Sequence, residues 1–180
     1  MLENHLSAEG LMTPTAALAG RLVPLVAEGA DDDTAVQERL TFRVGPFGIL
    51  VPPDAAREVV LPPTVSRLPH LPTWLPGIAN VRGTLVPVVD TARALEVEHD
   101  AAARRYLLIF NHGDEVFGLL VDGLPRRRSF AAHERLSSLP PHPALLDGHL
   151  ASAYDHDGLL WFELDIEGFF QTLGARIGQA

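Results

Sequence analysis

The stretch TWLPGIANVRGTLVPVVD, residues 73–90, contains two short apolar runs separated by an arginine and a glycine. The β-branched residues and the short length of both runs predict two buried strands. Gly83 between the runs predicts a chain reversal or bulge that needs the backbone freedom of glycine. In an alternating strand, one side would carry Ile78, Asn80 and Arg82, and the other Ala79 and Val81.

Three polar or conformationally restricted residues of this hairpin have separate expected roles. Pro87 cannot donate a ladder hydrogen bond, so its strand is expected to run along an edge or bulge. Asn80 is expected to bond the turn. Arg82 carries a planar guanidinium that can hold a carboxylate or a carbonyl. It therefore either contacts a partner or braces the hairpin from within, and both roles are compatible.

The rest of the chain from residue 39 also reads as short strands separated by turns. Proline-rich residues 65–77 and 136–148 are expected to form loops. Residues 92–97 are expected to form a short helical turn. Strands are predicted at 39–44, 47–51, 57–61, 104–110, 115–124 (continuing to 130) and 149–164, with hairpin turns at Gly45-Pro46, NHGD and Asp155–Gly158.

The C-terminus carries the clearest helix pattern. Asp165 is a good N-cap and Glu167 favours the positive end of the helix. Gly174 is placed to end the helix. One apolar face carries Ile166, Phe169, Phe170 and Leu173. Many short strands and one closing helix predict an all-β barrel architecture.

The first 38 residues differ in composition from the rest. Thr13 followed by Pro14 predicts a helix start, and the acidic stretch 28–34 is typical of a linker. A calcium loop starting at Asp31 would need Gly at its sixth position and Glu at its twelfth. The sequence has neither there, so a solvated linker is favoured.

Composition limits the possible functions. The 180-residue chain has no cysteine, which excludes disulfides and thiolate chemistry. Its 14 basic residues, all arginine, face 23 acidic ones, and the net charge of −9 disfavours sequence-independent binding to nucleic acid or anionic lipid. No signal peptide or membrane-spanning segment is evident. We expect a cytoplasmic protein without a cofactor, and the scattered histidines predict no metal site.

Several residues allow more than one interpretation. VVDTA, residues 88–92, resembles an aspartic protease turn in which Asp90 would need a second copy from a dimer partner. We favour Asp90 as the N-cap of a short helix. The run 126–128, three arginines, suits either a phosphate or acidic partner or, more simply, an edge that discourages aggregation. Trp74 and Trp161 are expected to lie in the core or to anchor loops, and of the two only Trp74, in a proline-rich surface segment, is a candidate for an interface.

Three segments in order and in register resemble the CheW-like family of chemotaxis adaptors. They are LPHLPTWLPGIANVRGTLVPVVDTARAL, RRYLLIFNHGDEVFGLLVDGL and GLLWFELDIEGFF, and together they cover roughly residues 39–174. The first segment and the N-terminal extension most resemble the branch that serves type IV pilus twitching motility. The implied domain plan is an extension at 1–38, a CheW-like domain at 39–174 and a tail at 175–180.

The resemblance implies both a fold and a function. The fold would be two small SH3-like β-barrels sharing a hydrophobic core, followed by the C-terminal helix. The function would be a non-enzymatic adaptor that holds the regulatory domain of a CheA-type histidine kinase beside the cytoplasmic tip of a methyl-accepting chemoreceptor. Partner contacts are expected at Arg82, Asn80, Gly83 and Trp74. The alternatives are a dimeric aspartic hydrolase using Asp90 and a stand-alone β-barrel module that binds a peptide or small ligand between its barrels.

Overall fold

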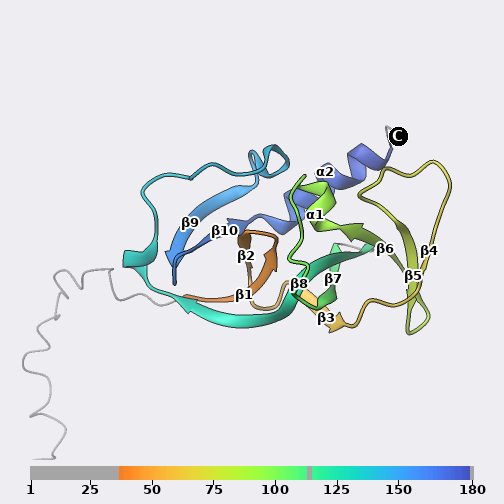
Figure 1. Ribbon diagram of the computed structural model, residues 1–180, viewed down its shortest axis with the longest axis horizontal. Helices are drawn as coiled ribbons and strands as arrows, with labels where there is room; N and C mark the ends of the chain where they lie inside the picture. The colour runs from red at the N-terminus through yellow and green to blue at the C-terminus, as the bar shows by residue number, and fades with distance from the viewer. Residues whose placement is uncertain (1–36, 113–114, 179–180) are drawn as a thin grey trace, which may run out of the picture. The chain divides into compact units, whose positions relative to one another are not determined.

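The computed structural model describes residues 37–112 and 115–178, which form a β-rich body with a C-terminal helix (Figure 1). The strands are β1 (Gln37–Val44), β2 (Phe47–Val51), β3 (Ala56–Val60), β4 (Val65–Ser66), β5 (Gly77–Val81), β6 (Thr84–Asp90), β7 (Arg105–His112), β8 (Glu115–Phe130), β9 (Leu150–His156) and β10 (Leu159–Leu164). The helices are α1 (Thr91–Ala94), α2 (Ile166–Ile177) and the 3-10 turns η3 (Ala132–Glu134) and η4 (Ala144–Leu146).

The long strand β8 joins two groups of strands. Its first half pairs with β7 and β6, and its second half pairs with β1. The first barrel consists of β3 to β7 and the first half of β8, and the second consists of β1, β2, β9, β10 and the second half of β8. In Figure 1 the two groups lie on either side of the region where β8 passes from one to the other. The expected two-barrel fold is confirmed.

Neighbouring apolar residues on one strand serve different cores. In β7, Leu108 and Phe110 enter a large shared core that also receives residues from β1, β2, β10 and α2. Leu107 and Ile109 point the other way, into a small core of the first barrel. A third cluster around Phe130 fills the second barrel. Successive side chains of a strand point to opposite faces, so a continuous apolar run indicates burial on both.

Gly48 and Trp161 pack against each other in the second barrel. They are register partners in the parallel pair β2–β10, and a Cβ at position 48 would lie 2.2 Å from Cε3 of Trp161. Only glycine leaves room for the indole ring, which is almost completely buried. Of the two roles expected for Trp161, core residue or loop anchor, the structure shows the first.

The predicted hairpins are confirmed with small shifts in their ends. The strand predicted at 57–61 runs instead from residue 56 to 60, and the loop 65–77 begins with the two-residue strand β4. Asp165 caps α2 by accepting a hydrogen bond from the Gly168 amide. The expectation that Gly174 ends this helix is wrong, because the helix continues to Ile177, which packs on the shared core.

The predictions for the N-terminal helix and the acidic linker lie outside the described residues. Within residues 37–112 and 115–178, none of the helices combines the length and apolar character needed to cross a lipid bilayer.

Candidate functional site

A tight turn forms the tip of the β5–β6 hairpin. Arg82 has φ 50° and Gly83 has φ 88°, the left-handed values of a type I′ turn. Asn80 accepts a hydrogen bond from the Gly83 amide through Oδ1 at 2.8 Å. The predictions of a turn-bonding Asn80 and a conformationally required Gly83 are confirmed. Arg82, however, does not continue the strand, which ends at Val81, because a two-residue reversal needs residue 82 in the turn itself.

Arg82 contacts another strand of its own barrel. Its Nη1 lies 3.5 Å from Oε2 of Glu58 on β3, so the intramolecular brace is present. The Arg82 side chain is nevertheless 81% exposed, whereas that of Glu58 is 20% exposed. An exposed ion pair contributes little to folding stability. The guanidinium group therefore remains accessible to another molecule.

The outer side of the hairpin is largely apolar. Asn80 lies opposite Leu85, and Ile78 lies opposite Pro87, whereas Ala79 and Val86 face inward. We call the four residues Ile78, Asn80, Leu85 and Pro87 the hairpin face. Leu85 is 66% exposed, and β6 pairs with β8 only from Val88 onward, so Pro87 lies where β6 has β5 alone as a neighbour. The expectation of an edge strand holds only for the first part of β6, which includes Pro87, because the strand as a whole lies between β5 and β8.

Trp74 lies far from the hairpin tip. Its backbone oxygen accepts a hydrogen bond of 2.8 Å from the Asp90 amide, at the opposite end of β6. The seven residues of β6 span about 20 Å. The Trp74 side chain is half-buried and packs on the shared core. The structure thus brings Asn80, Arg82 and Gly83 together and leaves Trp74 elsewhere.

Asp90 is part of a buried ionic network that the sequence patterns did not reveal. Both of its carboxylate oxygens accept hydrogen bonds from Arg105, at 2.9 and 3.1 Å, and Oδ1 also caps α1 at the Arg93 amide. The same guanidinium lies 3.8 Å from Asp122. Asp122 in turn accepts amide hydrogen bonds from Gly45 and Asp100. The network therefore ties α1, β7 and β8 to the β1–β2 turn.

The charge state of Asp90 follows from this geometry. Burial alone would raise the pKa of the carboxyl, but the hydrogen bonds and charge of Arg105, with a smaller effect of Arg93, outweigh burial and hold the pKa below its ordinary value. An aspartic protease needs two carboxylates that share a proton. A carboxylate held in its ionised form by a guanidinium does not suit that role, and the N-cap interpretation of Asp90 is confirmed.

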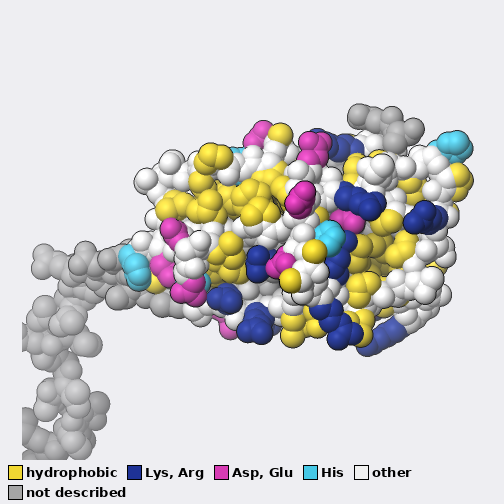
Figure 2. Space-filling view, viewed as in Figure 1, with side chains coloured by type: hydrophobic (Ala, Val, Ile, Leu, Met, Phe, Trp, Pro, Cys, Tyr) yellow, Lys and Arg dark blue, Asp and Glu magenta, His cyan; other side chains and the backbone are white. Residues whose placement is uncertain are grey.

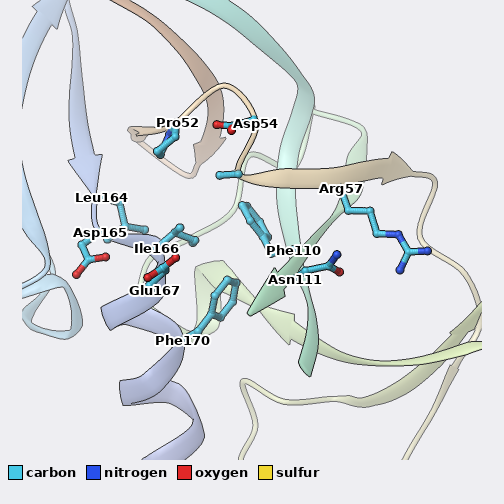
Figure 3. A pocket seen from close by; sticks show the side chains of 11 residues that line it. Pro52, Asp54, Arg57, Phe110, Asn111, Leu164, Asp165, Ile166, Glu167 and Phe170 are labelled. Carbon is cyan, nitrogen blue, oxygen red and sulfur yellow. The ribbon is translucent and has the colours of Figure 1, made fainter. Parts of the chain in front are cut away.

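A groove of about 580 Å³ lies between the barrels and the start of α2 (Figure 3). Phe110 and Phe170 form part of its floor, with their ring centroids 5.4 Å apart. Asp165 and Glu167 lie on the α2 side, and Arg57 extends away along β3 (Figure 3). A site between the barrels is what the alternative of a peptide- or ligand-binding module expects, but its lining residues were not predicted, because they come from segments far apart in the chain. The other lining residues are Pro52, Asp54, Ala55, Asn111, Leu164 and Ile166.

Three histidines of the described residues make local side-chain contacts. His142 bonds to Asp147, His149 to Thr172 and His156 to Glu134. In the part of the chain that the structure describes, no three His, Asp or Glu side chains are arranged to hold a metal ion.

The sequence and fold match one protein family. Residues 38–174 match the CheW-like domain. Protein PilI of Pseudomonas aeruginosa is 31% identical over 117 residues, 64% of this chain and 66% of PilI. Protein FrzA of Myxococcus xanthus is 32% identical over 87 residues, 48% of this chain and 54% of FrzA.

Solved structures show the same fold. The scaffolding protein TtCheW of Thermoanaerobacter tengcongensis superposes with a TM-score of 0.63 and 15% identity, over 79% of this chain and 93% of TtCheW. The matched part of this chain spans between about half and two thirds of the length of the curated relatives. With its family match over residues 38–174 and its twin-barrel fold, the chain belongs to the CheW-like family.

Proposed function

We propose that this protein is a non-enzymatic scaffold in a chemotaxis or twitching-motility pathway. It would hold the regulatory domain of a CheA-type histidine kinase next to the cytoplasmic tip of a methyl-accepting chemoreceptor. The proposal is supported by the relatives of this chain, which include PilI, FrzA and proteins named as chemotaxis protein CheW. We further propose that the protein works in the cytoplasm without a cofactor, and that it neither binds nucleic acid nor inserts into a membrane.

The hairpin tip is the observation that carries the proposal. An exposed guanidinium beside an apolar face, on a turn fixed by Asn80 and Gly83, has the composition of an interface centre. The turn is held before any partner arrives, so little conformational entropy is lost on binding. We assign partner contact to Arg82 and the hairpin face, with Asn80 and Gly83 shaping the turn. Trp74 would contribute at the other end of β6.

The shared core also favours a scaffold. The shared core packs both barrels and α2 into one interior, so a partner held on one barrel keeps a fixed geometry to a partner held on the other. We further propose that residues 39–174 suffice for this role, with 1–38 as an extension and 175–180 as a tail.

Affinity capture from the native cell tests the proposal. The tagged wild-type chain should retain a histidine kinase, and the Arg82→Glu variant should retain much less of it. The 580 Å³ groove between the barrels favours a second candidate function, a peptide-binding module without a kinase partner. Capture of peptides or unrelated proteins, with no histidine kinase, would support that candidate instead.

A further inference from the structure

The arginine run 126–128 is split between two sides of the second half of β8. Arg127 donates hydrogen bonds to Glu38 at 3.0 Å and to the Pro53 carbonyl at 3.3 Å. Arg126 and Arg128 point to the opposite side, as alternate residues of a strand do, and line a cleft of about 260 Å³. In Figure 2 several arginine side chains, in dark blue, lie in the region where Figure 1 draws β8.

This arginine cleft is a mixed basic and apolar surface at the second barrel. Arg128 stacks over the Trp161 ring, with the guanidinium carbon 5.4 Å from the ring centroid. Leu124, which also lines the cleft, is 54% exposed. Arg43 on β1 also lines the cleft.

The positive charges of the arginine cleft are poorly compensated. Within the described residues, Arg126 has no carboxylate within 4.0 Å, Arg43 reaches Asp100 only at 3.9 Å, and Arg128 reaches Asp157 only at 4.0 Å. Asp122 also lines the cleft, but its Oδ2 accepts the amides of Gly45 and Asp100, and Oδ1 faces Arg105.

Two arginines elsewhere in the same protein hold their acidic partners more closely. Arg39 lies 2.8 Å from Glu163, and Arg105 lies 2.9 Å from Asp90. In a chain with nine more acidic than basic residues, this cleft gathers three guanidinium groups, two held loosely by a carboxylate and one without a carboxylate partner among the described residues.

We propose that the arginine cleft binds an acidic segment of a partner protein. The carboxylates of this acidic segment would pair with Arg43, Arg126 and Arg128, because a guanidinium group can bind a carboxylate through two parallel hydrogen bonds. An apolar side chain of the same segment would cover Leu124. The net charge of −9 repels a nucleic acid chain over the whole molecule, and the exposed leucine offers nothing to a free phosphate. This surface is distinct from the hairpin face and belongs to the other barrel.

A labelled peptide of glutamates with two leucines provides the probe, and fluorescence anisotropy with the full chain provides the readout. The peptide should bind saturably, and Arg126→Glu should weaken binding about tenfold or more, as expected for loss of one charge-assisted contact and its replacement by repulsion. Arg127→Glu is the matched control, because residue 127 is adjacent but faces away. It should leave peptide binding unchanged. Amide NMR shifts caused by the peptide should centre on residues 123–128 and 41–43.

Other outcomes overturn the proposal. They are the absence of saturable peptide binding, equal weakening by Arg126→Glu and Arg127→Glu, and shifts centred elsewhere. Saturable, Arg126-dependent binding of inorganic phosphate or of a labelled single-stranded oligonucleotide in place of the peptide would assign the cleft to another ligand class. Arg82→Glu should not affect the peptide, so the result is independent of the scaffold proposal.

Discussion

Arg82 and Glu58 form an ion pair of 3.5 Å between the tip of the β5–β6 hairpin and strand β3, in which the arginine is mostly exposed and the glutamate mostly buried. A brace within the barrel and a contact to a partner make different demands on this pair. The brace needs both residues, whereas the partner contact needs only Arg82. Variants at the two positions therefore separate the two roles.

Arg82→Glu should leave the fold intact and weaken binding of the kinase or receptor by about 1–3 kcal/mol, as expected for a charged residue near an interface centre. Circular dichroism checks the fold, and titration calorimetry with purified partner domains checks the binding. Glu58→Gln is the control, since it removes the brace and keeps Arg82. It should leave partner affinity nearly unchanged. Equal losses from both variants would show that Arg82 acts only through its brace.

Gly83→Ala should destabilise the protein by about 1 kcal/mol through backbone strain alone. The position has φ 88°, and an added Cβ would contact nothing within 4 Å, so no steric clash contributes. Gly174→Ala makes the same chemical change in open space within α2. It should instead stabilise the protein, by up to about 1 kcal/mol. Urea unfolding measures the change in unfolding free energy for both variants. Changes of the same sign in the two variants would contradict this account.

Asp90→Asn should destabilise the fold by about 2–3 kcal/mol, because it leaves Arg105 without its closest carboxylate. The value lies below the usual range for a broken buried pair, since Asp122 remains 3.8 Å from the same guanidinium. Thermal or urea unfolding at neutral pH measures the effect. An unchanged stability would mean that the network contributes nothing to the fold.

The pH dependence of stability should change in the same variant. The pKa of Asp90 is lower in the folded chain than its ordinary value of 3.8, so the unfolded chain binds the proton more readily. The contribution of the ionised Asp90 carboxylate to folding stability is therefore complete above pH 3.8. It is lost as the pH falls through the pKa that Asp90 has in the folded chain. Unfolding free energies measured in acid should fall less steeply for Asp90→Asn than for the wild type. Parallel curves would contradict the assignment.

Gly48→Ala should destabilise the second barrel by about 1–3 kcal/mol, the usual cost of overpacking a core. The new methyl group would lie 2.2 Å from the Trp161 ring, so either the indole or strand β2 must move. The fluorescence of Trp161, compared in a Trp74→Phe background, should shift to longer wavelength as the ring becomes more exposed. An unchanged spectrum and stability would contradict the close packing.

Most of the fold could be predicted from the sequence because local rules determine it. Apolar runs such as LLIF, residues 107–110, predicted strands, and the structure shows a strand there with each residue of the run in one of two cores. Asp165 fixed the start of α2 through its side chain. The end of α2 was misplaced because glycine is tolerated inside a helix when a later residue, here Ile177, gains from packing.

The candidate site was predictable only in part. Asn80 and Gly83 were identified correctly because turn chemistry depends on neighbouring residues. The partners of Arg82 and Asp90 were not identified, since Glu58 and Arg105 come from other strands and depend on tertiary register. The arginine run 126–128 showed its charge in the sequence, but the division between its two sides required the pairing of β8 with β1.

The most direct test is to mix the purified protein with the kinase regulatory domain and a receptor tip fragment, and to measure the mass of the complex by size-exclusion chromatography with light scattering. The account predicts one ternary complex that contains both partners and is lost or reduced with Arg82→Glu. Partners that bind only one at a time, or not at all, would contradict it.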